Sequence, residues 1–251
     1  VPRTITSNDI LRGVKLSLDG IKKTYDGTTV VKYKEDASAA ALHNYLEHAY
    51  IMDGSNPLTD DDGNKIDIKD SLSVDPTRTH YADKNVNGEL PQGVTYGVDY
   101  TPTAQNRNLV ISGGALDYTG AQGKILRKEV TANILSPLTK EYDALRDVAG
   151  VAKNNNGQTV QTGDSLIRFD GLTGNDGVNN LSTARYLAKD AGTGLRVDYD
   201  ARLDSDNYRI VNAADLHSDD NEITKRRLNL AFDDVRKEYD ATPNNGSITA
   251  R

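Results

Sequence analysis

The clearest structural signal in this sequence is Val94-Thr95-Tyr96-Gly97-Val98-Asp99-Tyr100, in which apolar and polar residues alternate. The same alternation returns further along the chain in Leu195-Arg196-Val197-Asp198-Tyr199. Because successive side chains of a strand point to opposite faces of a sheet, each stretch predicts a half-buried β-strand. Turn signals such as Asp62-Gly63, Asn87-Gly88 and Gly174-Asn175-Asp176-Gly177 separate the strands from one another.

The composition favours the same structural class. Asp outnumbers Glu by 30 to 7, and the chain also contains 21 Gly. Asp competes with the backbone for hydrogen bonds and prefers turns and caps, whereas Glu is well tolerated inside helices. We therefore predict an all-β chain built from tandem Ig-like antiparallel β-sandwich domains. A β-grasp-like unit, in which a helix packs across a sheet, is the alternative fold.

Charge and residue usage exclude several classes of protein. A formal net charge of −7 argues against a nucleic-acid partner, which would require a basic face. The absence of Cys excludes disulfides, thiolate nucleophiles and Cys-bound metal sites. No apolar run approaches the roughly 18–20 residues that cross a bilayer, so we expect no membrane insertion in this segment.

One short block occurs three times along the chain. It reads Ile21-Lys22-Lys23-Thr24-Tyr25-Asp26-Gly27-Thr28-Thr29, then Leu138-Thr139-Lys140-Glu141-Tyr142-Asp143-Ala144, then Val235-Arg236-Lys237-Glu238-Tyr239-Asp240-Ala241-Thr242. The first and second tyrosines are 117 residues apart (142 − 25), and the second and third are 97 apart (239 − 142). Periods of this size indicate whole domains rather than the short repeats of a solenoid.

These blocks divide the chain into four predicted parts. They are a lead-in from a preceding unit (1–20), a first repeat (21–135), a second repeat (136–233) and the start of a third (234–251). A sequence that begins before one repeat and ends inside another is typical of a segment of a longer array of repeats. The neighbouring repeats of the same chain are therefore expected partners.

A helical insertion is predicted in the first repeat only, at about 37–52. An apolar stripe runs from Ala39 to Tyr50 at helical spacing, and Asp53-Gly54 would end the helix. An insertion found in one repeat is a natural place for a repeat-specific function. The alternative function is thus a glycan- or protein-binding module that recognises a host or matrix surface. Its ligand surface would consist of Tyr45, His48 and Tyr50.

A family resemblance is carried by an ordered series of short blocks spread over most of the chain. They are Lys23-Thr24-Tyr25-Asp26-Gly27-Thr28-Thr29, Tyr81-Ala82-Asp83-Lys84-Asn85-Val86, and Ala191-Gly192-Thr193-Gly194 with Asp206-Asn207-Tyr208. This series resembles the YDG repeat, named for its Tyr-Asp-Gly motif, which occurs in tandem in large secreted bacterial adhesins and haemagglutinin-like surface proteins. The resemblance implies an extracellular or cell-surface stalk or adhesive region that has no enzymatic activity and no cofactor.

The motif itself suggests a structural role. Its residues here are Tyr25, Asp26 and Gly27 in the first block, Tyr142 and Asp143 in the second, and Tyr239 and Asp240 in the third. We expect each tyrosine ring to be buried at a strand end with a turn directly after it. Because Ala144 and Ala241 replace the motif glycine, a strict requirement for positive φ is not expected in those two blocks.

The best candidate for an ion site is the acidic stretch from Asp60 to Asp67. Calcium takes six to eight oxygen ligands, and Asp60, Asp62, Asn64 and Asp67 could supply some of them around Gly63. The competing interpretation is a hairpin turn of the Asp-Gly type. Calcium is the only metal for which the sequence offers a candidate.

A catalytic alternative rests on Gly163-Asp164-Ser165-Leu166, which matches the nucleophile motif of a lipase and esterase family. A serine hydrolase needs a histidine base and an acid that orients it. That family supplies the pair as Asp-x-x-His, whereas here Asp215-Leu216-His217 has the wrong spacing. We therefore expect no enzyme, and a hydrolase through Ser165 is the weakest of the functional hypotheses.

Overall fold

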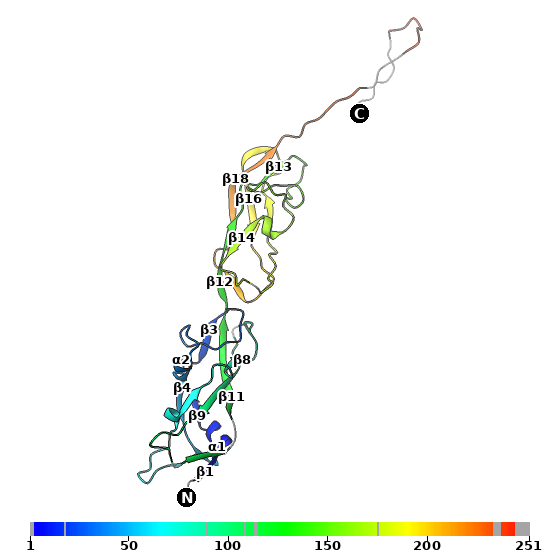
Figure 1. Cartoon of the computed structure of the whole chain (residues 1–251). Coiled ribbons are helices and arrows are strands. Elements are labelled where there is room, and N and C mark those ends of the chain that lie inside the picture. The colour runs from blue at the N-terminus through cyan, green and yellow to red at the C-terminus, as the bar shows by residue number, and fades with distance from the viewer. Residues whose placement is uncertain are drawn as a thin grey trace. The chain divides into compact units, whose positions relative to one another are not determined.

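The computed structural model of the chain describes residues 3–17, 19–88, 90–107, 109–112, 115–174, 176–232 and 237–243. The chain divides into two compact units (Figure 1). Unit 1 comprises Val1–Ala132, Phe169–Asn180 and Arg202–Asn212, and unit 2 comprises Asn133–Arg168, Leu181–Ala201 and Ala213–Arg251. Two segments from within the predicted second repeat, 169–180 and 202–212, therefore belong to unit 1. Both units are built mainly of strands, which confirms the all-β class.

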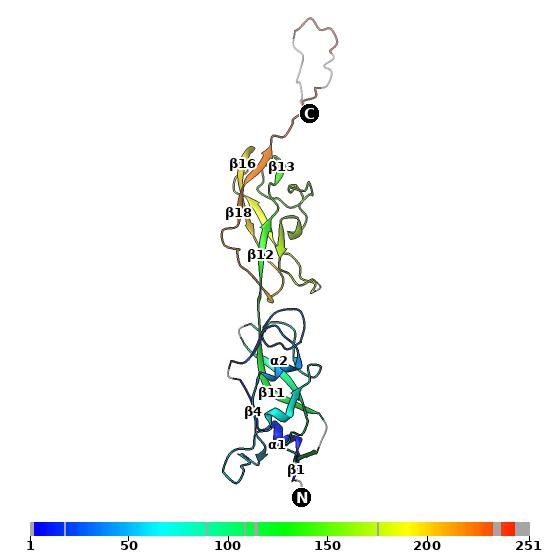
Figure 2. The same cartoon turned by 60° about the vertical axis from the view of Figure 1, so that its left-hand side comes forward.

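Unit 1 contains two short α-helices, α1 and α2, among many strands (Figure 2). Its elements are β1 (Arg3–Thr6), α1 (Ser7–Leu11), β2 (Val14–Leu16), β3 (Ile21–Thr24), α2 (Ala39–His43), β4 (Leu46–Ala49), β5 (Met52–Asp53), β6 (Asn56–Pro57), the 3-10 helix η1 (Lys69–Ser71), β7 (Leu72–Val74), β8 (His80–Tyr81), β9 (Gln92–Tyr100), β10 (Leu109–Ser112), β11 (Leu116–Leu126) and β17 (Tyr208–Ile210). Two further strands, β12 (Lys128–Ile134) and β14 (Ile167–Asp170), contain residues of both units.

The main sheet of unit 1 has the strand order β3-β11-β9-β7, and β8 also pairs with β9. Strands β9 and β11 pair antiparallel, with Tyr118 opposite Tyr96. Strand β3 pairs in parallel with the end of β11, from Ile21 opposite Gly123 to Thr24 opposite Leu126. Smaller pairs join β1 to β10, β2 to β4 and β5 to β6.

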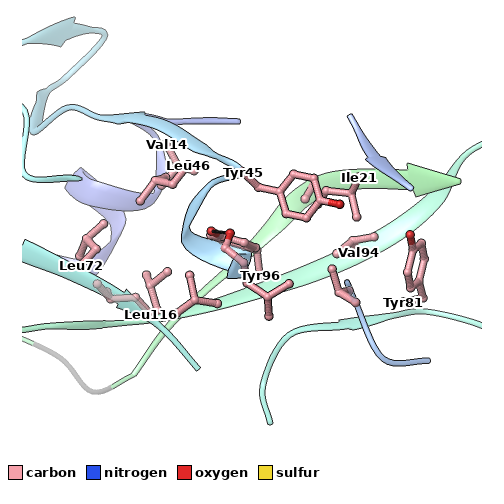
Figure 3. Close-up of a cluster of buried hydrophobic side chains, with 14 of the residues drawn as sticks. Val14, Ile21, Tyr45, Leu46, Leu72, Tyr81, Val94, Tyr96 and Leu116 are labelled. Atoms are coloured by element: carbon pink, nitrogen blue, oxygen red, sulfur yellow. Dashed lines mark hydrogen bonds between the residues drawn. The ribbon is translucent and has the colours of Figure 1, made fainter. Parts of the chain in front are cut away.

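The core of unit 1 follows from the alternation along β9. Val94, Tyr96 and Val98 are buried on one face of the strand, where they meet side chains from β3, β4, β7 and β11 (Figure 3). Helix α2 packs against β7, and the Tyr96 hydroxyl donates a hydrogen bond of 2.7 Å to the Leu42 carbonyl. The stretch that predicted a half-buried strand thus forms the centre of the sheet.

The main sheet of unit 2 connects its strands in the same order as the main sheet of unit 1, and unit 2 has fewer further strands and helices. Its elements are β13 (Thr139–Glu141), the 3-10 helix η2 (Gly163–Ser165), β15 (Thr183–Tyr186), β16 (Gly192–Asp200) and β18 (His217–Thr224). The sheet order is β13-β18-β16-β15, with β13 parallel to β18 and the other neighbours antiparallel. Leu138, Tyr186, Val197 and Ile223 are buried in its core.

The sheets differ from the predicted antiparallel arrangement. In each main sheet the strand that comes first in the sequence, β3 or β13, runs parallel to the strand that comes last, β11 or β18. Both main sheets are therefore mixed. Parallel neighbours need a long connection between them, and here that connection is most of the repeat. Local alternation indicates strands but carries no information on such a long-range pairing.

The predicted helix at 37–52 is wrong in its second half. Ser38 caps α2, accepting a hydrogen bond from the Ala41 N–H, but the helix ends at His43 and the chain continues as β4. Strand β4 pairs with β2, and the Ala49 N–H donates to the Asp67 carboxylate at 2.9 Å. These tertiary contacts outweigh the helical spacing of the apolar residues.

The predicted lead-in is not a linker, because residues 3–17 are part of unit 1. Ile5, Ile10 and Val14 are buried in its core. A capping box begins α1, in which Thr6 and Asp9 bond each other's backbone N–H groups at 3.3 and 3.1 Å. Across the part of the chain that the structure describes, no helix has the length and apolar character needed to cross a bilayer.

Candidate functional site

The first motif block forms a turn around a buried lysine. The Lys23 side chain is 1 % exposed, and its Nζ lies 2.8 Å from the Asp26 Oδ1 and 2.7 Å from the Thr28 carbonyl oxygen. The Tyr81 ring lies 5.4 Å from the same nitrogen. Burial lowers the pKa of Lys23, although Asp26 opposes this effect. A buried ammonium group requires such partners, so the turn and the lysine stabilise each other.

The second block repeats this arrangement in unit 2. The Lys140 side chain is 0 % exposed, and its Nζ lies 2.8 Å from both the Asp143 Oδ1 and the Leu145 carbonyl oxygen. It also donates to the Asp147 carbonyl at 3.0 Å, and the Tyr186 ring lies 5.6 Å away. Both units thus contain a buried lysine, an aspartate three residues later and a neighbouring tyrosine.

The third block forms the same turn at the surface. Lys237 pairs with the Asp240 Oδ1 at 2.5 Å and donates to the Thr242 carbonyl at 2.8 Å, yet its side chain is 25 % exposed. The contacts of the turn are therefore present here without full burial of the lysine. The structural role of the lysine is missing from the sequence-based prediction, although the constant spacing of Lys and Asp in the three blocks signals it.

The residue after each motif aspartate has a positive φ. The angles are 78° at Gly27, 66° at Ala144 and 61° at Ala241. The expectation that alanine removes the requirement for positive φ is therefore wrong. An L-residue in the left-handed region costs about 1–2 kcal/mol, and the aspartate and lysine contacts hold the alanines there.

The three motif tyrosines differ in burial. Tyr25 is 2 % exposed and meets the edge of the Tyr208 ring, with ring centroids 5.5 Å apart at 81°. Beside this pair, the Asn207 side chain accepts from the Val86 N–H at 2.8 Å and donates to the Asn85 Oδ1 at 2.9 Å. A segment of the second repeat thus completes the surroundings of Tyr25 in unit 1.

The expected burial fails for the other two rings. Tyr142 is half-buried, and Tyr239 is 95 % exposed. A hollow of about 490 Å³ lies next to Tyr142, and its lining includes Asp190, Ala191 and Leu228. Tyr25 shows that the motif tyrosine can be buried when another segment of the chain packs against it.

The predicted ligand surface is only partly at the surface. Tyr45 is buried, and its hydroxyl donates to the Lys32 carbonyl at 2.5 Å, so it is not available to a ligand. His48 stacks on Tyr50, with ring centroids 4.9 Å apart at 18°, and its Nδ1 lies 2.8 Å from the Asp67 Oδ2. Of the three predicted residues, His48 and Tyr50 therefore remain candidates for a ligand surface.

The acidic stretch forms a turn whose oxygens have local partners. The Asp60 Oδ1 accepts from the N–H groups of Asp62 and Asn64 at 3.0 and 2.8 Å. Asp67 instead accepts from the Ala49 N–H at 2.9 Å, on another strand. Within the described ranges, no three His, Asp or Glu side chains gather where they could hold a metal ion. The geometry supports the hairpin interpretation, with Gly63 at φ 84°.

Calcium provides a direct check of this stretch. Because the Asp60 carboxylate already binds local N–H donors and Asp67 lies in a different set of contacts, we expect millimolar calcium to leave the thermal unfolding midpoint unchanged. Differential scanning calorimetry with calcium and with a chelator measures this. A calcium-dependent rise that disappears in Asp60→Asn would restore the metal site.

Among the residues that the structure describes, no histidine forms a hydrogen bond with Ser165. Ser165 ends the 3-10 helix η2, and its Oγ accepts from the Gln161 N–H at 3.4 Å. His217 directs its Nδ1 to the Asp215 carbonyl at 2.8 Å, and its Nε2 lies 3.7 Å from the Asp219 carboxylate. Neither ring nitrogen contacts Ser165 among the contacts of the described residues, so the base that a serine nucleophile needs is not beside it.

Comparison with known proteins returns no relative: no protein-family model, no curated protein and no solved structure matches this chain. The functional argument therefore rests on the geometry of the two units and of the three turns.

Proposed function

We propose that this chain is a non-enzymatic, tandem-repeat segment of a secreted or surface-exposed bacterial adhesin, in which the repeats act as mechanical modules. The main support is that two stretches of the chain follow the same strand path and carry the same buried Lys–Asp turn directly after the first strand. The turn occurs a third time, at Lys237 to Thr242. Resemblance of the motif blocks to YDG repeats agrees with this role.

The strand pairing of unit 2 suits a module under tension. The chain enters β13 at Thr139 and leaves β18 at Thr224, and the two strands are parallel neighbours. The entry and exit points therefore lie at opposite ends of the pair. Tension between them loads the hydrogen bonds together in shear, whereas an antiparallel pair pulled from its shared end would open one bond at a time. The buried Lys140 anchors the turn that follows β13.

The finer fold that we propose is β-grasp-like rather than Ig-like. Parallel pairing of the first and last strands is unlike an antiparallel sandwich. In unit 1, α2 packs against β7, and the Leu42 carbonyl accepts from Tyr96 in the centre of the sheet. This is the arrangement expected when a helix packs across a sheet.

A second candidate function is recognition of a host or matrix glycan through His48 and Tyr50. The stacked, partly exposed rings are the observation that favours it, because aromatic faces are common in ligand sites. Glycan-array binding by the full chain that is lost in Tyr50→Ala would support this function.

The proposed mechanical function is tested by pulling the full chain from its two ends in a single-molecule force experiment. We expect discrete unfolding events, one of them from the sheared β13–β18 pair of unit 2. Smooth extension without discrete events would contradict the proposal, because it would mean that the repeats do not resist tension as modules.

A further inference from the structure

Unit 1 shows how a segment of the second repeat is bound beside a motif tyrosine. Residues Tyr208–Ile210 form β17, which pairs in parallel with Lys128–Val130 of β12. The Asn207 side chain bonds both Asn85 and Val86, and the Tyr208 ring covers Tyr25. Three kinds of contact therefore hold the segment: strand pairing, amide hydrogen bonds and an aromatic edge.

The same position can be located in unit 2 from backbone hydrogen bonds. The Tyr25 N–H donates to the Leu126 carbonyl at 2.8 Å, and the Tyr142 N–H donates to the Thr224 carbonyl at 2.9 Å. In unit 1, Lys128–Val130 begins two residues after Leu126. The corresponding stretch of unit 2 is therefore 226–228.

Among the described residues, the corresponding groups of unit 2 are more exposed than those of unit 1. Val130 is 1 % exposed beneath its partners, whereas Leu228 is 85 % exposed. Tyr142, Asp190, Ala191, Lys225, Arg226 and Leu228 line the hollow of about 490 Å³. Asp190 and Ala191 follow Tyr186 by the same intervals at which Asn85 and Val86 follow Tyr81.

We infer that this face of unit 2 is a docking site for the β17-like segment of a following repeat. The face consists of Tyr142, Asp190, Ala191 and residues 225–228, and is called here the Tyr142 face. The inference rests on the proposed function, because it takes the repeats of an array as the partners. It commits to this occupant because the equivalent face of unit 1 already binds Asn207 and Tyr208.

The chemistry of the face specifies the occupant further. The Asp190 carboxylate accepts an amide N–H from an asparagine, as the Asn85 Oδ1 does in unit 1. In unit 1, Glu129 lies opposite Arg209 in the strand register and pairs with it. Arg227 has the position of Glu129 in unit 2, so the docked segment should carry an acidic residue where β17 has Arg209.

The test uses the full chain lengthened by one repeat, with residues 136–233 repeated after residue 233. We expect the backbone amides of 226–228 in the first copy to exchange with deuterium roughly tenfold more slowly, or slower still, than in the original chain. Replacing Arg209 with Glu in the added copy should slow exchange further, because it removes a repulsion with Arg227. Asn207→Ala with Tyr208→Ala in the added copy should abolish the protection.

These variants leave the module itself intact, since 202–212 does not belong to unit 2. The thermal midpoint of the added copy provides the check on its folding. Unchanged exchange at 226–228 in the lengthened chain, with and without Arg209→Glu, would overturn the docking site. If discrete force-unfolding events persist in that case, the proposed function still stands; loss of those events would contradict the function itself.

Discussion

Replacing Asp143 with asparagine should destabilise unit 2 strongly while leaving its shape unchanged. The Lys140 side chain is 0 % exposed, and among the described residues Asp143 supplies the only carboxylate that contacts its ammonium group, at 2.8 Å. Removing one partner of a buried ion pair leaves an uncompensated charge and costs about 3–5 kcal/mol. Because the Asp143 side chain is 23 % exposed and water reaches it, we expect the lower end of this range. Hydrogen exchange of the β13 and β18 amides measures the loss within unit 2.

A matched control is present in the same chain. Asp240 makes the same pair with Lys237 at the surface, where water can replace it. Asp240→Asn should therefore leave the stability of both units unchanged. Equal effects of Asp143→Asn and Asp240→Asn would show that burial of the lysine does not matter.

The ion pair between Lys140 and Asp143 should also make the stability of the protein depend on pH in the acid range. Burial opposes the shift, but the Lys140 ammonium and the Leu145 N–H lower the pKa of Asp143 below its ordinary value near 3.8. A carboxylate whose pKa is lower in the folded protein than in the unfolded chain stabilises the fold at pH values above its pKa in the unfolded chain. This stabilisation is lost as the pH falls through its pKa in the folded protein. Stability should therefore decline below about pH 4, and less steeply in Asp143→Asn.

The second large effect is expected at Asn221, which is 0 % exposed in β18. Its Oδ1 accepts from the Leu138 N–H at 2.8 Å, and its Nδ2 donates to the carbonyls of Leu195 at 2.8 Å and Ser218 at 3.0 Å. Asn221→Leu keeps a similar volume but removes the side-chain partner of these backbone groups. Each such group costs about 1–3 kcal/mol, so unit 2 should lose about 3 kcal/mol or more. Urea unfolding followed by hydrogen exchange measures this loss.

Asn212 is the control for this substitution. It makes two similar bonds, both at 2.8 Å, with the N–H and carbonyl of Ala132, but it is only half-buried and belongs to unit 1. Asn212→Leu should cost less, because it removes two bonds to the backbone instead of three and because the Asn212 side chain itself is half-buried. If Asn221→Leu cost no more than Asn212→Leu, the buried amide would not be a structural centre of unit 2.

Local patterns predicted the strands but not their pairing. The alternation around Tyr96 correctly placed a half-buried strand, because its period depends only on neighbouring residues. The parallel contact between β3 and β11 joins residues about a hundred positions apart in the sequence, and no local signal specifies it. For the same reason the helix prediction was correct at α2 and failed at β4, where the partner strand β2 decides the structure.

The candidate site was predictable to a similar extent. The three motif blocks correctly located the turns. The prediction assigned the structural role to Tyr25, Tyr142 and Tyr239, whereas the lysine of each block makes the contacts that hold the turn. Burial of Tyr25 depends on Asn207 and Tyr208, which are far away in the sequence. Tyr45 was predicted to belong to a ligand surface because it lies in the insertion found in one repeat only, whereas its hydroxyl bonds the Lys32 carbonyl. Such long-range contacts leave no trace in a single sequence.

The mechanical role of the repeat is tested most directly by comparing two pulling directions on unit 2. Because the chain has no Cys, Thr183→Cys with Asp200→Cys provides unique attachment points at the paired ends of β15 and β16. Pulling there opens an antiparallel pair one bond at a time, whereas pulling from the chain ends shears β13 against β18. We predict a clearly higher unfolding force from the chain ends. Equal forces in the two directions, or a lower force from the chain ends, would contradict this account.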